Sequence, residues 1–154
     1  MRLLIFHVEA FACTVTEKGR SPLVETPAEP TTRIENGLLV LASVEAGDES
    51  AAGEVGRGAV AEIAKLAAQL KLREIMVLPF AHLFAESAPP AAALSLIDDV
   101  AGQLRSLDFT VERPPFGWFH TWDMQAKGHP LSRVARSIRP SASPTASLPS
   151  DRGA

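Results

Sequence analysis

The chain has 154 residues, 46% of them hydrophobic and 21% charged, and its formal net charge is −3. This size fits one domain, and the composition is ordinary for a soluble globular protein. The apolar runs are far shorter than the roughly 20 residues that a membrane helix needs, and the apolar start is too short for a signal peptide. The net negative charge argues against a large nucleic-acid footprint.

The charge is distributed unevenly along the chain. Residues 1–100 hold 8 basic and 14 acidic residues, whereas residues 101–139 hold 6 basic and 3 acidic. The basic carboxyl-terminal third can meet a few phosphates. Random asymmetry on a solvated surface explains the charge pattern equally well.

The first elements in chain order are strands. Residues 2–8 form a continuous apolar run with β-branched and aromatic members, which is typical of a buried strand. Residues 11–16 predict a second strand, paired to the first through a tight turn. Residues 18–36 contain three prolines and predict a loop or an irregular edge segment. Residues 38–44 predict another buried strand.

Two long helices are expected to alternate with further strands. Apolar residues at helical spacing predict a helix over residues 51–70, and residues 74–79 predict a strand. Ser87 precedes two prolines, which predicts the capped start of a second helix, because proline is tolerated in a first helical turn. Apolar residues between 94 and 104 mark the core face of that helix.

The last third of the chain is expected to complete the domain. Residues 109–113 and 118–126 predict two strands, and a short helix is predicted from Pro130. Two long helices and this short one against a mixed sheet define a two-layer α/β (α+β) domain over residues 1–138. Residues 139–154 are rich in Pro, Ser and Ala, and they predict a linker or a disordered tail.

The polar residues predict neither a metal site nor a cofactor. The single cysteine, Cys13, excludes an internal disulfide, fits a reducing cytoplasm, and lies in an apolar stretch typical of a buried core residue. The sequence contains no phosphate loop, dinucleotide fingerprint or paired-cysteine pattern, and Ser87 has no nucleophile-elbow context. None of the four histidines has zincin-like spacing: His7, His82, His120 and His129.

Two short segments combine a histidine with backbone that proline or glycine forces into a special path. In LPFAHL at residues 78–83, His82 follows the end of a predicted strand, where ligands commonly gather. The amides of Ala81 and His82 are expected to be free to meet a carbonyl or hydroxyl oxygen. A lone histidine at a strand end is, however, more often structural than catalytic.

The second segment is PFGWFH at residues 115–120. Gly117 has no Cβ, so a ligand or another strand can approach its backbone closely. Trp118 and Phe119 are expected to alternate, one toward the core and one toward a cleft. An aromatic ring at that rim can stack on the terminal adenine of a tRNA, an interaction worth about 1–3 kcal/mol, or both rings can belong to the core.

Together with MRLLIFH at residues 1–7 and KGHP at residues 127–130, these segments resemble the editing domain at the start of archaeal threonyl-tRNA synthetases. The resemblance runs from Met1 to about Ile138. It implies a D-aminoacyl-tRNA deacylase-like fold and hydrolysis of Ser-tRNA(Thr) in the cytoplasm, without a cofactor. It also implies a homodimer paired through sheet edges. The other expected partners are the tRNA 3′ end and the synthetase catalytic and anticodon-binding domains, in cis or in trans.

The need for such an activity is physical. A synthetic site that recognises threonine cannot strongly reject serine, because one methyl group is worth only about 1–3 kcal/mol. A second, smaller sieve then admits serine and excludes threonine. In the family, main chain is thought to build this sieve, and the terminal ribose 2′-hydroxyl is used with an activated water.

The resemblance also implies site residues. Backbone N–H groups at Ala81 and His82 are expected to stabilise the developing oxyanion, which can contribute about 3–4 kcal/mol per donor. His82, His120 and Ala81 are the expected catalytic positions. The pocket is expected to be lined by Val44, Pro79, Phe80, Ala81 and His82, and opposite them by Phe116, Gly117 and Phe119.

Two positions depart from the family pattern. His120 stands where the family usually has lysine, and Arg133 stands where it usually has glutamate. Histidine is mostly neutral at pH 7, so a mechanism that needs an ammonium does not transfer, whereas one based on backbone and substrate hydroxyl does. We expect Arg133 to bind substrate and to supply the cation that position 120 lacks.

Two other functions fit the same residues. The fold can serve a D-aminoacyl-tRNA deacylase, which differs in the stereoisomer that its pocket accepts. Alternatively, the changes at His120 and Arg133 can mark an inactive module that binds the tRNA end or dimerises. Turnover of seryl and D-aminoacyl esters distinguishes the three functions.

Overall fold

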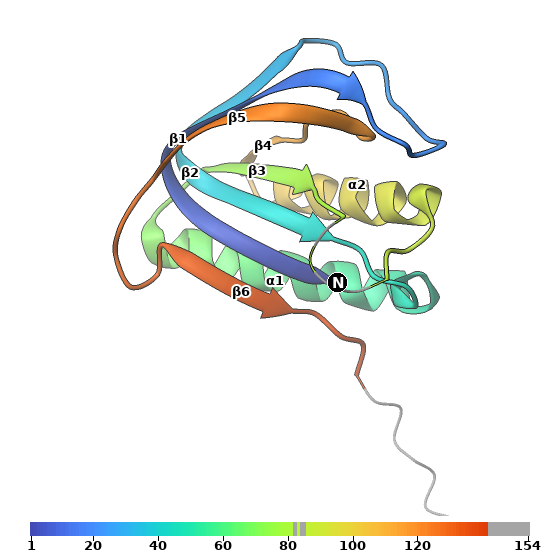
Figure 1. Cartoon of the computed structure of the whole chain (residues 1–154). Coiled ribbons are helices and arrows are strands. Elements are labelled where there is room, and N and C mark those ends of the chain that lie inside the picture. Colours follow the sequence, from blue (N-terminus) through green and yellow to red (C-terminus); the bar gives the residue numbers. More distant parts are fainter. Residues whose placement is uncertain (82, 84–85, 142–154) are drawn as a thin grey trace, which may run out of the picture.

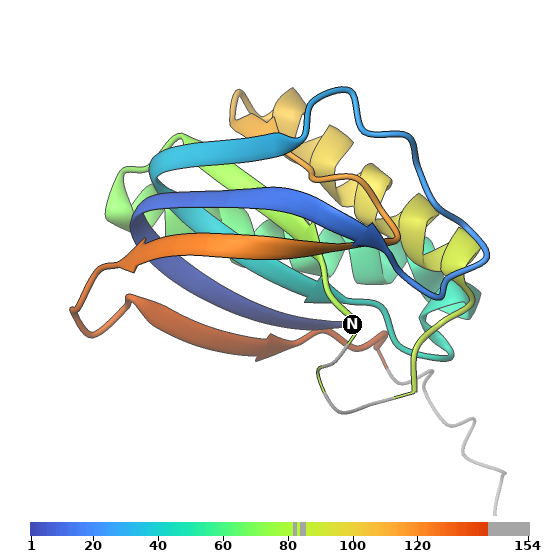
Figure 2. The same ribbon diagram turned by 45° about the horizontal axis from the view of Figure 1, so that its top comes forward.

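The computed structural model describes residues 1–81, 83 and 86–141. In this part of the chain, six strands form one sheet, and two α-helices cover one of its faces (Figure 1, Figure 2). Neither helix is long and apolar enough to cross a membrane. The elements in chain order are β1 (Arg2–Lys18), β2 (Thr31–Ser43), the 3-10 helix η1 (Asp48–Ala51), α1 (Ala52–Leu70), β3 (Glu74–Pro79), α2 (Pro90–Ser106), β4 (Thr110–Glu112), β5 (Trp118–Ala126) and β6 (Arg133–Ser137).

The sheet is mixed, as the sequence predicts. Its order is β4-β3-β2-β1-β5, and β6 also pairs with β1. The pairs β2–β3 and β3–β4 are parallel because α1 and α2 carry the chain back between them, whereas β1 is antiparallel to β2, β5 and β6. One edge of β1 is shared: β6 pairs along residues 2–6, and β5 pairs along residues 8–18.

The bend in β1 gives the molecule two cores. The larger core lies between the sheet and the helices, and the smaller one lies on the other face, under the second half of β1 (Figure 1). Leu3 and Ile5 face the helices, whereas Phe11 and Cys13 face the smaller core. The alternation shifts by one residue because β1 carries a bulge between Val8 and Ala10 where it pairs with β5.

This bulge corrects the prediction of two strands joined by a tight turn, since residues 2–18 form one continuous strand. The loop predicted over residues 18–36 is also shorter, because β2 already begins at Thr31. Ser87 does not cap α2; it forms an isolated bridge with Glu45, and Pro89 is the N-cap residue.

The prediction of a short helix from Pro130 is wrong. The chain instead forms β6, in which Val134 pairs with Ile5 and is buried. Buried residues at 134 and 138 match helical spacing, but a five-residue segment gains little from helical propensity. Pairing with β1 satisfies the backbone groups along the free edge of that strand, and this tertiary contact decides the conformation.

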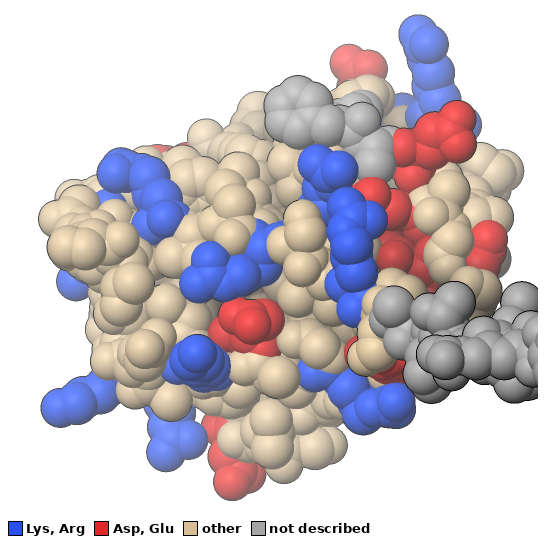
Figure 3. Space-filling model, turned by 90° about the horizontal axis from the view of Figure 1, so that it is seen from below, with Lys and Arg blue, Asp and Glu red and all other residues tan. Residues whose placement is uncertain are grey.

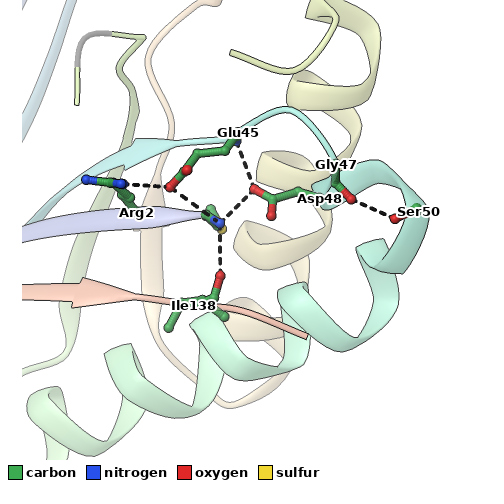
Figure 4. A network of polar contacts seen from close by, with 7 residues as sticks. Arg2, Glu45, Gly47, Asp48, Ser50 and Ile138 are labelled. Atoms are coloured by element: carbon green, nitrogen blue, oxygen red, sulfur yellow. Dashed lines mark hydrogen bonds and ion pairs between the residues drawn. The ribbon is translucent and has the colours of Figure 1, made fainter. Parts of the chain in front are cut away.

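The ammonium group of Met1 joins three distant segments (Figure 4). It lies 2.7 Å from Asp48 Oδ2 and donates to the carbonyl oxygen of Ile138 at 2.9 Å. Asp48 is only 6% exposed, and its Oδ2 also accepts from the Glu45 N–H at 2.8 Å. Glu45 in turn pairs with Arg2 at 2.8 Å. The start of β1, the turn before α1 and the chain after β6 are thereby held together.

We expect Asp48→Asn, in a chain with an unextended Met1, to lower the free energy of unfolding by about 3 kcal/mol, because the buried ammonium keeps its desolvation cost and loses its carboxylate. Urea denaturation followed by circular dichroism measures the change. The exposed neighbour Glu49, changed to Gln, is the control and is expected to stay within about 0.5 kcal/mol. Equal stability of both variants would show that Asp48 does not hold the ammonium.

Candidate functional site

Backbone hydrogen bonds fix the segment after β3 at both of its ends. The Phe80 N–H donates to the Ala42 carbonyl at 2.9 Å, and the Ala88 N–H donates to the Val44 carbonyl at 3.0 Å. Ala81 is exposed, and within the described residues its N–H has no hydrogen-bond partner. Such a backbone donor, on an exposed residue beside a fixed strand end, can meet a ligand oxygen.

The other predicted residues of this segment occupy different positions. Pro79 is half-buried at the end of β3 and pairs with Ala42 of β2. The Val44 side chain is buried in the larger core and does not line an open surface. His82, the predicted catalytic histidine, lies outside the described residues.

The turn at residues 115–117 is held by Glu25, a residue that the sequence analysis missed. Glu25 Oε1 accepts from the Phe116 N–H at 2.7 Å, and the Glu25 carboxylate pairs with both Nη atoms of Arg113 at 2.6 and 2.8 Å. The Glu25 carbonyl accepts from the Trp118 indole at 2.7 Å. Arg113 also contacts Asp98 of α2 at 2.6 Å. Because 88 residues separate Glu25 from Arg113, no local sequence signal indicates this pair.

The charge pair shifts both pKa values. The hydrogen bonds from Arg113, with a further one from the Phe116 N–H, hold the pKa of Glu25 below its ordinary value of 4.5, although burial opposes this. Hydrogen bonding to Glu25 raises the pKa of Arg113. The pair therefore stays ionised, and it fixes the turn beside β5.

Gly117 has the conformational role that the sequence predicts, but with a different neighbour. Its φ is +90°, and a Cβ there would lie 2.6 Å from the Leu23 carbonyl oxygen. The close approach is therefore made by residues 23–24 of the chain itself. Phe116 packs against the larger core. Both residues build the turn. The Phe116 ring and the side-chain position of Gly117 are turned toward other parts of the chain and not toward solvent.

The two faces of β5 carry different aromatic residues. Phe119 is 57% exposed, and alternation along the strand places it on the face opposite His120 and Trp122. The Trp122 ring lies 5.7 Å from Phe11 and 6.0 Å from Phe80, measured between ring centroids. Trp122 therefore brings the His120 face of β5 next to the end of β3.

The sequence analysis did not select Trp122. Its spacing of two residues from His120 within a predicted strand was the signal that could have identified it. The Trp122 indole N–H donates to His120 Nδ1 at 3.2 Å. Burial lowers the pKa of His120. The ring is therefore neutral at pH 7 and offers a hydrogen bond rather than a charge.

The structure does not bring Arg133 together with His120. Arg133 pairs with Phe6 at the start of β6, whereas His120 pairs with Val15. These two β1 positions are nine residues apart, or about 30 Å along an extended strand. In Figure 1, β6 begins at the opposite end of the molecule from the end of β3. Arg133 does not replace a cation at position 120 within one copy of the chain.

Arg133 belongs instead to a basic segment. Residues 127–139 contain four basic residues and no acidic one. Figure 3 shows Lys and Arg side chains spread over the face that is seen from below in Figure 1, where β6 lies. Among the described residues, Lys127 pairs with Glu9 and Arg136 with Glu62, whereas Arg133 is exposed and has no ion-pair partner.

Two of the four histidines, His7 and His129, contact each other and have a structural role. His7 Nδ1 lies 2.8 Å from His129 Nε2, and His7 Nε2 lies 3.1 Å from Asn36 Oδ1. This bonding ties the turn before β6 to the middle of β1. Across the residues described, no group of three or more His, Cys, Asp or Glu side chains lies close enough to hold a metal ion.

Comparison with known proteins places the chain in a family. The model of the archaea-specific editing domain of threonyl-tRNA synthetase matches residues 1–138. The threonine–tRNA ligase of Thermococcus onnurineus is 38% identical over 142 residues, which cover 92% of this chain and 23% of that protein. The ligase of Methanosarcina mazei is 37% identical over 142 residues, which cover 91% and 22%. The chain therefore belongs to this family of editing domains, and membership implies a role in proofreading.

A solved structure supports the fold. The c-Myc DNA unwinding element binding protein matches with a TM-score of 0.66 and 16% sequence identity, covering 92% of this chain and 100% of that one. At this identity the likeness shows the fold alone, and it confirms the predicted D-aminoacyl-tRNA deacylase-like fold. The chain spans less than a quarter of the length of the ligases that it matches.

We expect Glu25→Gln to lower the free energy of unfolding at pH 7 by about 2 kcal/mol, because the turn loses a charged, two-pronged pair. The pKa of Glu25 is lower in the folded than in the unfolded chain. The stabilisation is therefore complete above pH 4.5, its ordinary pKa, and is lost as pH falls through the folded value. Urea denaturation between pH 3 and 7 measures both effects.

The wild type should lose more stability than Glu25→Gln over the acid part of this range. Glu29→Gln is the matched control, since Glu29 is exposed in the same loop and has no ion pair among the described residues. Parallel pH curves for wild type and Glu25→Gln would contradict the assignment of the pair.

Proposed function

We propose that this domain hydrolyses the ester bond of L-serine that has been attached in error to tRNA(Thr). Family membership supports proofreading, and the observation that carries the chemistry is the Ala81 N–H just after β3, which has no hydrogen-bond partner among the described residues. Phe80, packed beside Trp122, fixes the backbone just before this donor. His120 lies on the same face of β5 as Trp122 and supplies a neutral ring.

The proposed reaction uses water and the substrate itself. A water oxygen attacks the ester carbonyl carbon, helped by the free hydroxyl of the terminal ribose. The Ala81 N–H stabilises the negative charge that develops on the carbonyl oxygen. The bond between that carbon and the ribose oxygen then breaks. The ribose oxygen takes up one proton of the attacking water, the other proton passes to solvent, and serine leaves as its carboxylate. We propose that His82 and His120 orient the substrate and the water.

Selection against threonine is proposed to be steric. We propose that main chain at residues 79–81 forms one wall of the serine pocket, because main chain cannot move aside as a side chain can. The extra methyl group of threonine is then excluded at a cost of about 1–3 kcal/mol or more. Serine, which is smaller, retains contact with the backbone donors.

We propose tRNA(Thr) as the partner, with further synthetase domains in cis or in trans, because the chain matches only part of the ligases. A homodimer is also proposed. The outer edge of β5 has no strand partner among the described elements, and Phe119 and Met124 are 57% and 40% exposed. An unpaired edge with apolar side chains is suited to pairing with a second copy.

The isolated chain is expected to deacylate Ser-tRNA(Thr) at least about tenfold faster than Thr-tRNA(Thr) at neutral pH. Release of labelled amino acid measures both rates. Ala81→Pro removes the backbone donor and should lower the rate at least about 100-fold, whereas Ala81→Gly keeps the N–H and is the matched control.

The alternatives give other outcomes. Hydrolysis of a D-aminoacyl-tRNA with L-seryl-tRNA spared would identify the D-aminoacyl-tRNA deacylase function. Binding of the tRNA without loss of any ester would identify the inactive module. One observation favours the inactive module: His120 is neutral at a position where the family usually has a cation.

We further expect Arg133→Ala to weaken tRNA binding several-fold without changing kcat, because Arg133 lies far from His120 along β1 and can contact a phosphate. The slope of log KM against log salt concentration should fall by about one. Lys65→Ala, an exposed change of equal charge on α1, is the control. A fall in kcat with unchanged KM would place Arg133 in the reaction instead.

A further inference from the structure

We propose that Trp122 is a positioning residue that holds the His120 imidazole in a single neutral tautomer, with its proton on Nε2. The part that this ring plays in catalysis rests on the hydrolysis proposed above. The tautomer itself follows from the geometry of β5 and can be tested without any substrate.

The argument begins with the chemistry of the two rings. An indole N–H donates a hydrogen bond and cannot accept one. Trp122 Nε1 lies 3.2 Å from His120 Nδ1 and donates its hydrogen to it, so Nδ1 must carry a lone pair. A neutral imidazole has one N–H and one lone pair, which puts the proton on Nε2. A protonated ring would turn two N–H groups toward each other and lose the bond.

The indole can enforce this choice because its own position is fixed. Its ring meets Phe11 edge-on at 70° and Phe80 at 44°. Phe11 is fully buried in the smaller core, and the Phe80 backbone is bonded to Ala42. Burial of His120 acts in the same direction, because it disfavours the charged form. The His120 ring therefore holds one orientation relative to the end of β3, which Ala81 follows.

The fixed tautomer decides which chemistry His120 can perform. Its Nδ1 lone pair is occupied by the indole, so the ring is not the base that activates water. Its Nε2–H remains as a neutral donor to an oxygen of the substrate, either the ester or the ribose. Trp122 thus lets a neutral ring supply one directed hydrogen bond at a position where the family usually has an ammonium.

Nitrogen NMR of the full chain at pH 7.5 tests the tautomer, with the ring of His120 assigned through a His120→Gln spectrum. The wild type should show the Nε2–H form. Trp122→Phe, and 3-benzothienylalanine at position 122, which replaces the N–H with sulfur, should both give a mixture of tautomers. Thr121→Ser, an exposed change on the other face of the same strand, should keep the wild-type signal. An Nδ1–H or charged ring in the wild type would overturn the proposal, as would an unchanged signal in both Trp122 variants.

Kinetics with Ser-tRNA(Thr) test the role. Loss of one directing hydrogen bond should lower kcat about three- to tenfold in both Trp122 variants, with KM within about twofold of the wild type. Thr121→Ser should match the wild type. Unchanged kcat in both variants would overturn the positioning role. An inactive wild type would overturn the proposed hydrolysis and this role with it, whereas the NMR result alone decides the tautomer.

Discussion

The bulge in β1 is the constraint on which the remaining structure depends. It reverses the side-chain alternation between Val8 and Ala10, so that the odd-numbered side chains face the helix-covered core before the bulge and the smaller core after it. A regular strand of 17 residues would send the same alternate side chains to one face throughout. The second half of β1 could then not fold over the far face of β3, and β5 would lie away from the strand end that carries Ala81.

The candidate site follows from this curvature. Trp122 pairs through β5 with Cys13, yet its ring reaches Phe80, which follows β3. Contact between these positions is made across the curled sheet rather than along a ladder of neighbouring strands. The Phe80 ring packs against the Trp122 ring, and the Phe80 N–H is bonded to the Ala42 carbonyl. Because these contacts fix the backbone at Phe80, the neighbouring donor at Ala81 needs no charged side chain to position it.

The sequence predicted those elements whose evidence is local. Residues 74–79 are an apolar run with a proline at the end, and the predicted strand has the observed bounds. The helix over residues 51–70 was predicted within one residue, because its apolar residues keep helical spacing over five turns. Both features depend on side chains that are close in sequence.

The wrong predictions concern segments whose conformation is set by contacts with residues distant in the sequence. The predicted turn near Glu9 is a bulge, and whether a strand bends or reverses depends on what pairs with it, which local sequence does not show. Val134 and Ile138 fit a helix as well as a strand until the free edge of β1 is known. Glu25 looked like one acidic residue in a proline-rich loop, although it holds the turn at Phe116 across 91 residues.

The separation of His120 from Arg133 bears on how the site meets a charged substrate. A lysine at position 120, half-buried beside Trp122, would carry its charge into these surroundings and incur a desolvation cost. A histidine with its Nδ1 bonded to the indole avoids that cost by staying neutral. The recognition of phosphates can then rest with the basic segment at residues 127–139, which remains solvated. The cations that contact phosphates then lie on the surface, where salt screens their charges. The reacting ester is contacted by backbone and ring N–H donors, and the strength of these neutral hydrogen bonds depends little on ionic strength.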